Sequence, residues 1–286
     1  MPVYLSLEGN RSRAAAETGC LPALYIVQET FQERLSIPVK HVILPDNGKR
    51  VLAISDIHGY KDGFLRLLQN ANYDPSRDQL LLLGDYIDAD NAVSWDTLDL
   101  VRELTESGAI AIPGNQELKL ASLADRSRSR RRRSSLPSKV NRYEKWILSL
   151  PLFVIHNHIL FAHAGIRPGV PLTQQSVRDL TEVRELFFNY PLDQLAALID
   201  QDESNREGAI WTRVMFGHTP TFKLGGEPGQ IWSDGRRIGI DTGSKHGYRL
   251  TLLDLNSGST YSCATSPGYQ SSDFRIGTAK DRLQLP

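Results

Sequence analysis

Hydrophobic residues in the first half of the chain form three short runs, at 51–54, 80–83 and 109–112. Between the runs, apolar side chains recur every three or four residues, as at Phe64 and Leu68, and this spacing is typical of one face of a helix. Runs of apolar residues without alternation are typical of strands buried on both faces. The order strand, helix, strand therefore predicts a parallel sheet with right-handed crossovers.

The second half of the chain has a different pattern, with more strands and fewer helices. Asn157 and His158 stand between two apolar runs and predict a two-residue hairpin turn, and residues 173–198 predict one or two surface helices. Together the two halves indicate an α/β fold in which two sheets pack face to face and are flanked by helices. The later apolar runs lie at 152–155, 159–161, 214–216, 237–240 and 248–253.

The two ends of the chain lie outside this pattern. Residues 1–48 are interpreted as an N-terminal extension, with a short helix over 21–35 and an edge strand over 37–44. Residues 49–265 form the predicted catalytic domain, and residues 266–286 are interpreted as a C-terminal tail. No function is assigned to either end.

The segment 126–138 interrupts the predicted domain with six arginines and five serines. Because it has almost no apolar side chain to bury, we expect a flexible, solvated insertion. The arginines from Arg126 to Arg133 could contact nucleic acid or an acidic surface.

Composition excludes several classes of protein. The 286 residues are 40% hydrophobic and 23% charged, with a formal net charge of zero, so no field of the whole protein favours nucleic acid or membrane. No apolar stretch approaches the roughly 18 residues of a membrane span, and the first residues lack the order of a signal peptide. Cys20 and Cys263 are too few and too far apart for a disulfide framework. These features predict a cytoplasmic protein.

Polar residues of similar kinds follow the predicted strands. Asp56 and His58 come directly after the first run, and two residues at this spacing on a strand point to the same side. Ligand sites of parallel sheets gather at the carboxyl ends of strands. Six strand ends with Asp, His or Asn, mostly beside glycine, are too many for coincidence. The further candidates are Asp85, Asp88, Asn115, His163, His218 and Asp241.

These residues lie in motifs that resemble those of the calcineurin-like metallophosphoesterases, in the phosphoprotein phosphatase branch and most closely its bacterial members. The resemblance covers residues 50–265 and implies a four-layer α/β sandwich with two mixed sheets. The matching motifs are Ser55-Asp-Ile-His-Gly59, Gly84-Asp85-x-x-Asp88, Gly114-Asn115-x-Glu117, His163-Ala-Gly165 and Gly217-His218.

The resemblance implies a site for two divalent metal ions that activate water for in-line attack on phosphorus. Asp56 and His58 would hold the first ion and Asp85 would bridge both. Asn115, His163 and His218 would complete the second site, and Asp241 would orient a ligand. Mixed oxygen and imidazole ligands suit manganese first, with iron or zinc as alternatives.

The chain departs from the family pattern at two positions. The family's third motif has a histidine that protonates the leaving oxygen, oriented by the residue that matches Asp88, but here Gln116 stands there. An amide can donate a hydrogen bond but cannot deliver a proton near pH 7. Ala89 replaces an arginine that binds phosphate. Arg184 matches another phosphate-binding arginine of bacterial relatives, and Arg167 is a weaker candidate.

The first functional hypothesis is a metal-dependent phosphoesterase acting on phosphomonoesters, most like a protein serine/threonine phosphatase, with a phosphorylated protein or a small phosphoester as substrate. Because Gln116 cannot supply a proton, we expect weak activity or a preference for acidic leaving groups. The alternatives are a dinucleoside polyphosphate hydrolase and a phosphate-binding protein that has lost turnover.

Overall fold

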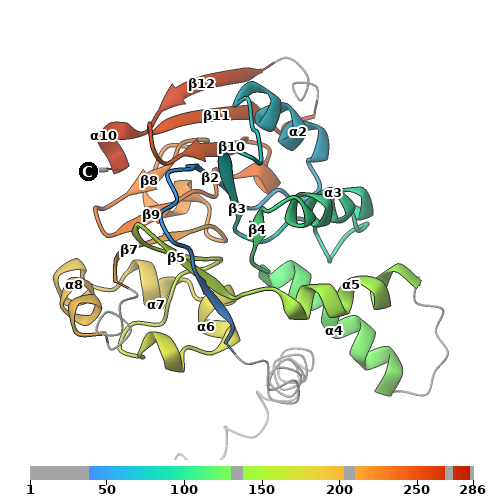
Figure 1. Ribbon diagram of the computed structural model, residues 1–286. Coiled ribbons are helices and arrows are strands. Elements are labelled where there is room, and N and C mark those ends of the chain that lie inside the picture. The colour runs from blue at the N-terminus through green and yellow to red at the C-terminus, as the bar shows by residue number, and fades with distance from the viewer. Residues whose placement is uncertain (1–38, 130–137, 203–209, 268–272, 284–286) are drawn as a thin grey trace, which may run out of the picture. The chain divides into compact units, whose positions relative to one another are not determined.

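The computed structural model describes residues 39–129, 138–202, 210–267 and 273–283. One of its two six-stranded mixed sheets has the strand order β12-β11-β10-β2-β3-β4, and Figure 1 shows β2 between β10 and β3. β2, β3 and β4 are parallel, whereas β10 runs antiparallel to β2. The bounds are β2 Arg50–Ile54, β3 Asp78–Leu82, β4 Ile110–Ala111, β10 Arg249–Asp254, β11 Ser259–Ala264 and β12 Phe274–Thr278.

The other sheet has the order β1-β5-β6-β7-β9-β8. β5 and β6 form the predicted hairpin, in which Asn157 (φ 45°) and His158 (φ 62°) both have the left-handed backbone of a tight two-residue turn. β6, β7 and β9 are parallel, so their carboxyl ends share one edge. The bounds are β1 His41–Ile43, β5 Phe153–His156, β6 His158–Ala162, β7 Trp211–Phe216, β8 Trp232–Ser233 and β9 Arg237–Gly239.

The two sheets pack face to face through one hydrophobic core. Ala53 and Leu81 of one sheet lie in the same buried cluster as Phe161, Met215 and Ile238 of the other. Helices cover the outer faces: α2 packs on β10 and β11, and α8 packs on β7. The predicted architecture is therefore confirmed.

The helices are short, and most of them connect the strands. In α2 the buried side chains are Phe64, Leu67 and Leu68, which are part of the predicted helical stripe. α4 and α5 pack against each other (Figure 1). The α-helices are α2 Lys61–Asn70, α3 Trp95–Glu106, α4 Asn115–Ser129, α5 Ser138–Ser149, α6 Val177–Glu182, α7 Glu185–Phe188, α8 Leu192–Gln201 and α10 Lys280–Leu283, and the 3-10 turns are η1 Leu172–Gln174, η2 Thr221–Leu224 and η3 Ser244–His246.

Three expectations need correction. Residues 126–129 of the arginine-rich segment continue α4, because arginine is a good helix former once a helix has begun; residues 130–137 lie outside the described part. The region 173–198 holds α6, α7 and most of α8 rather than one or two helices. The expected C-terminal tail contains β12 and α10, whose Leu283 is buried in the core.

One of the two elements predicted near the N-terminus lies in the described part of the chain. The edge strand predicted over 37–44 is present as β1, while the helix predicted over 21–35 lies outside the described residues. Within the described ranges, no helix is both long enough and apolar enough to cross a membrane. The cytoplasmic location and the contacts of the arginine-rich segment stay predictions.

Candidate metal centre

The six predicted ligand side chains come together where strands from both sheets end. Two of them follow β2, one follows β3, and one begins the helix after β4; the other two follow β6 and β7 of the second sheet. The site therefore joins the sheets at their common edge. These residues are Asp56, His58, Asp85, Asn115, His163 and His218.

The backbone turns sharply at four of these ligands. Asp56 (φ 51°), His58 (φ 47°), Asp85 (φ 53°) and His218 (φ 62°) all have left-handed backbone, which costs a residue other than glycine about 1–3 kcal/mol and is concentrated at functional sites. Asp56 and His58 therefore converge because the chain turns after β2, not because they alternate along an extended strand as the sequence suggested.

Each of the three imidazoles has one nitrogen near a backbone carbonyl or hydrogen-bonded to one. His163 Nδ1 lies 2.7 Å from the carbonyl oxygen of Leu83, and His58 Nδ1 lies 3.2 Å from that of Ile87. The His218 ring bonds the backbone of Glu182, while its Nε2 is buried and has no hydrogen-bond partner among the residues that the structure describes. An imidazole that donates from Nδ1 keeps its lone pair on Nε2, the arrangement of a metal ligand.

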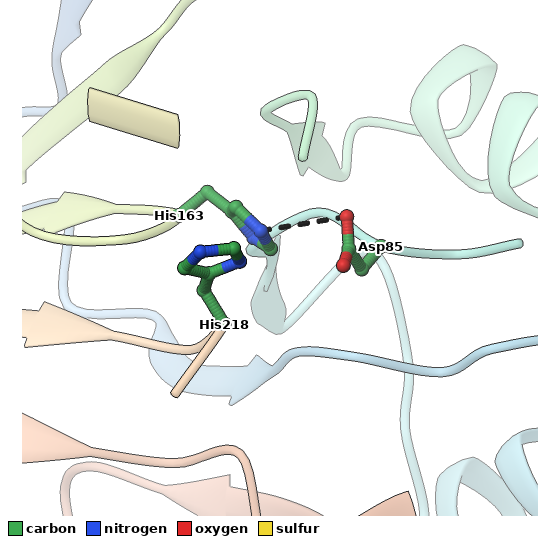
Figure 2. A group of neighbouring side chains, drawn as sticks. All are labelled: Asp85, His163 and His218. Carbon is green, nitrogen blue, oxygen red and sulfur yellow. Dashed lines mark ion pairs between the residues drawn. The ribbon is translucent and has the colours of Figure 1, made fainter. Parts of the chain in front are cut away.

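The donor atoms form two groups that share Asp85. His58 Nε2 lies 3.7 Å from Asp56 Oδ1 and 3.8 Å from Asp85 Oδ2. His163 Nε2 lies 3.4 Å from Asp85 Oδ1 and 3.3 Å from Asn115 Oδ1. Figure 2 shows His163 and His218 beside Asp85, and the donors of each group lie within 4.8 Å of one another. This spacing leaves Asp85 able to bridge two ions.

The charge states of Asp56 and His218 suit cation binding. Burial lowers the pKa of His58, but its hydrogen bond to Asp56 and the charge of Asp85 raise it to about 9, so a metal ion would have to displace a proton from this imidazole. Burial alone would raise the pKa of Asp56, but its contacts with His58 and the charge of His163 lower it to about 2. Burial and the charges of His163 and Arg184 lower the pKa of His218 well below its usual value. Asp56 is thus ionised and His218 neutral at pH 7. The donor set and the buried His218 Nε2 fit divalent ions such as manganese, iron or zinc.

Two glycines let these loops approach one another. A Cβ on Gly114 would overlap Asp85, and a Cβ on Gly217 would overlap Asp56 and Ser55. Any larger residue at either position would push a ligand carboxylate aside. The glycines beside the ligands in the sequence are therefore explained by the close packing of ligand loops.

Glu117 organises the second ligand loop, a role that the sequence analysis did not assign although the residue lies in the third motif. Its carboxylate accepts hydrogen bonds from the backbone N–H groups of Asp85 (2.8 Å), Tyr86 (2.8 Å) and Gly114 (2.9 Å). Burial and the charge of Asp85 raise the pKa of Glu117 to about 7. Glu117 is fully buried and fixes Asp85 through its backbone.

The predicted role of Asp241 in orienting a ligand stays a prediction. The carboxylate of Asp241 accepts a hydrogen bond from the backbone N–H of Gly243 (3.0 Å). The backbone carbonyl of Asp241 accepts one from the backbone N–H of Thr221 (2.9 Å). Burial and the charge of Asp56 raise the pKa of Asp241 well above its usual value. Asp241 therefore ties together the loops that follow β7 and β9.

The predicted substrate-binding residues are arranged differently from the family pattern. Gln116 Oε1 accepts from the backbone N–H of Ala89 (2.9 Å), whereas Asp88 lies 3.1 Å from Lys245 Nζ.

Arg184 donates to the carbonyl oxygen of His218 (3.2 Å), so it lies beside the metal centre. Arg167 lines a cavity of about 200 Å³ with residues of α8. The catalytic roles of Asp88, Gln116 and Arg184 stay predictions.

Curated relatives of known name match much of this chain. It is 26% identical over 273 residues to the symmetrical bis(5'-nucleosyl)-tetraphosphatase of Photobacterium profundum, covering 74% of this chain and 97% of that protein. It is 34% identical over 125 residues to the protein of the same name from Aromatoleum aromaticum, covering 42% of this chain and 45% of that one.

Solved structures agree with the fold. A protein provisionally assigned as a diadenosine tetraphosphatase superposes with a TM-score of 0.58 at 23% identity, covering 80% of this chain and 100% of that one. A protein serine/threonine phosphatase from Saccharomyces cerevisiae, similar to human phosphatase PP5, gives 0.50 at 15% identity and 90% coverage of both chains. The sequence profile described as calcineurin-like phosphoesterase matches residues 49–251. This chain therefore belongs to the calcineurin-like phosphoesterase family.

Proposed function

We propose that this chain hydrolyses the phosphoanhydride bonds of nucleoside polyphosphates, with dinucleoside polyphosphates as the substrate class. The observation that carries the proposal is a full set of ligand side chains beside a position 116 that cannot supply a proton. Gln116 is held by the backbone of Ala89, so its amide group is left only as a neutral hydrogen-bond donor.

We expect the ligand residues to have the roles that the family implies. Asp56 and His58 would hold one divalent ion, Asp85 would contribute to both sites, and Asn115, His163 and His218 would complete the second set. When bound, the two ions neutralise phosphate oxygens and lower the pKa of a water molecule between them. The protein's contribution is to fix the donor atoms, mainly through backbone hydrogen bonds to the imidazoles and through Glu117.

The nature of the leaving group separates the candidate substrates. When a phosphoanhydride bond is hydrolysed, the leaving oxygen becomes a terminal phosphate oxygen, whose pKa is about 6, so it departs without being protonated. When a phosphoserine ester is hydrolysed, the leaving alkoxide is far more basic and a missing general acid costs about 10²–10⁴-fold in rate. Gln116 therefore favours anhydrides over the phosphomonoesters that the first hypothesis named.

The named relatives support the same choice. Those from Photobacterium profundum and Aromatoleum aromaticum are named symmetrical bis(5'-nucleosyl)-tetraphosphatases. The third hypothesis, a binding protein without turnover, is disfavoured because all six ligand side chains are present and brought together.

A substrate panel tests this proposal. Purified protein with Mn²⁺ is given diadenosine tetraphosphate, a nitrophenyl phosphate and a phosphoserine peptide, and kcat/KM is measured for each. We expect the tetraphosphate to be hydrolysed at least about 100-fold more efficiently than the phosphoserine peptide. Equal efficiency on both substrates, or a preference for the peptide, contradicts the proposal.

A further inference from the structure

Lys245 stands in a short rigid turn between β9 and β10 that is tied to the metal centre. The turn is the 3-10 segment η3, bracketed by Gly243 (φ 87°) and Gly247 (φ 75°) in left-handed backbone. Ser244 Oγ donates to the backbone carbonyl of Asp56, a predicted metal ligand. The position of Lys245 is therefore set by the same loop that places the first ion's ligands.

Asp88 holds the ammonium group of Lys245. Lys245 Nζ lies 3.1 Å from Asp88 Oδ2, and the carboxylate also accepts from Asn91 Nδ2 (2.8 Å) and from the N–H of Asp90 (3.1 Å). The Asp88 side chain is 14% exposed and that of Lys245 is 41% exposed. The lysine is thus oriented from one side while its ammonium group remains accessible to a ligand.

This pair brings a positive charge to Asp88, and Lys119 of α4 brings another to the neighbouring Asp90. Ala89 has no charge to offer, and Gln116 is bonded to the backbone of Ala89 rather than to Asp88. In the family pattern, the carboxylate at the position of Asp88 orients a histidine. In this chain, Asp88 instead orients a lysine from another loop. Positive charge therefore reaches this edge of the site from the loop after β9 and from α4.

Two more cations lie around the same turn. Arg184 Nη1 donates to the backbone carbonyl of His218 (3.2 Å), at the second group of ligands. Lys223 is next to Phe222, whose ring contacts that of His246 with centroids 5.3 Å apart. The pKa of His246 is lowered by burial and by the charges of Lys223, His58, Lys245 and Arg184, as expected where cations surround it. Lys245, Arg184 and Lys223 thus give this side of the site a positive charge that suits a ligand with several phosphates.

We propose that Lys245 contacts the leaving phosphate of a polyphosphate substrate and thereby makes the site selective for polyphosphates. The inference rests on the proposed function and adds the residue that recognises the chain of phosphates. In the hydrolysis, the oxygen of water bonds to the attacked phosphorus and the anhydride P–O bond breaks. The leaving oxygen keeps the electron pair as a terminal phosphate oxygen, and the ammonium group of Lys245 donates a hydrogen bond to that phosphate. One proton of the water passes to solvent, and the other stays on the new hydroxyl group of the attacked phosphorus.

The test compares Lys245→Met with Lys245→Arg and with Lys145→Met, which removes an exposed lysine of α5. Two measurements are made on the Mn²⁺-loaded protein. The first is kcat and KM for diadenosine tetraphosphate and for nitrophenyl phosphate, and the second is the dissociation constant of ADP by calorimetry, measured with its non-hydrolysable α,β-methylene analogue. Nitrophenyl phosphate has no phosphate in its leaving group, and the ADP analogue reports binding without turnover.

Loss of one charge-assisted hydrogen bond to phosphate corresponds to about a 10-fold change. We expect Lys245→Met to raise the KM for the tetraphosphate and the dissociation constant of ADP by about this factor, while its KM for nitrophenyl phosphate stays within about 2-fold. Lys245→Arg should retain most of the ADP affinity, and Lys145→Met should match the wild type.

An unchanged ADP affinity in Lys245→Met, or equal losses on both substrates, overturns the inference. If the wild-type protein hydrolyses neither substrate, the proposed function falls, and the ADP comparison alone decides the role of Lys245.

Discussion

The metal-ligand cage and the substrate-facing rim of this site are built in different ways. The cage consists of buried side chains fixed by backbone groups: His163 is 0% exposed and bonded to the carbonyl of Leu83, and Asp85 is held through Glu117. The rim is formed by Asp88, Gln116 and Lys245. Lys245 and Asp88 are partly exposed and pair with each other, whereas Gln116 is buried and bonded to the backbone of Ala89. The cage keeps the family pattern, whereas the rim departs from it.

The cost of substitution explains this difference. Removing one cage residue leaves buried polar groups without partners, at about 1–3 kcal/mol each or more for charges. Substitutions on the surface usually change stability by no more than about 0.5 kcal/mol. A rim can therefore exchange one substrate contact for another while the metal centre stays intact. Three changes, taken in order of expected effect, test this contrast.

Asp85→Asn should have the largest effect, because Asp85 belongs to both groups of donors. Loss of an outer hydrogen-bond partner of a metal ligand costs about 10–100-fold in metal affinity or activity, and loss of the shared ligand itself should exceed that range. Metal content by mass spectrometry and kcat/KM for diadenosine tetraphosphate measure the change.

The matched control is Asp96→Asn, which removes an exposed carboxylate that lies 3.8 Å from Lys61. It should keep both metal content and activity. A variant Asp85→Asn that retains two ions and full activity would show that the cage does not depend on its shared carboxylate.

Gln116→His tests whether the rim can be returned to the family pattern. A histidine at position 116 needs Asp88 to orient it, but Lys245 occupies that carboxylate. We therefore expect the single variant to gain less than about 10-fold on an alkyl phosphomonoester, and the double variant with Lys245→Met to gain about 100-fold, the lower end of general-acid catalysis. Steady-state kinetics on phosphoserine measure both; equal gains would mean that the ion pair of Asp88 and Lys245 has no influence on residue 116.

The sequence predicted the cage better than the rim for a physical reason. The predicted ligands follow buried strands. Such strands appear in the sequence as runs of apolar residues, and the end of each run shows where the strand ends and its polar residues begin. The contact between Lys245 and Asp88 joins two loops 157 positions apart (245 minus 88), and no local pattern indicates such a pair. Glu117 was similarly missed because its four hydrogen-bond partners are backbone N–H groups, which a sequence does not display.

The same limit applies to the edges of the fold. β11 and β12 were not predicted, because β11 is rich in serine and threonine and β12 is largely exposed, with Ile276 at 66%. They are added to the sheet through β10, whose six residues are all buried. Strand pairing, rather than the local pattern of apolar residues, determines these outer strands.

Asp78→Asn should have the smallest functional effect, because it removes a structural ion pair at the opposite end of β3 from Asp85. Arg50 donates to both carboxylate oxygens, from Nε (2.9 Å) and Nη2 (2.7 Å). Burial alone would raise the pKa of Asp78, but the hydrogen bonds from Arg50 and from the N–H of Asp74 lower it below its usual value. We expect a loss of about 2 kcal/mol in the free energy of unfolding at pH 7 with kcat unchanged.

The pH dependence of that loss has a definite sign. Because the pKa of Asp78 is lower in the folded state, its contribution is complete above the unfolded value of about 3.9 and disappears as the pH falls through the folded value. The free energies of unfolding of the two proteins, measured with denaturant, should therefore differ by a constant amount from pH 7 to about pH 5 and converge as the pH falls below about 3.9. A difference that persists unchanged at the lowest pH at which both proteins fold would assign the loss to packing rather than to the ion pair.

The most direct test of the central claim is anomalous X-ray diffraction from crystals of the wild-type protein grown with Mn²⁺. Two ion peaks are predicted, one among Asp56, His58 and Asp85 and the other among Asp85, Asn115, His163 and His218. A single peak, or ions bound away from Asp85, would contradict the account.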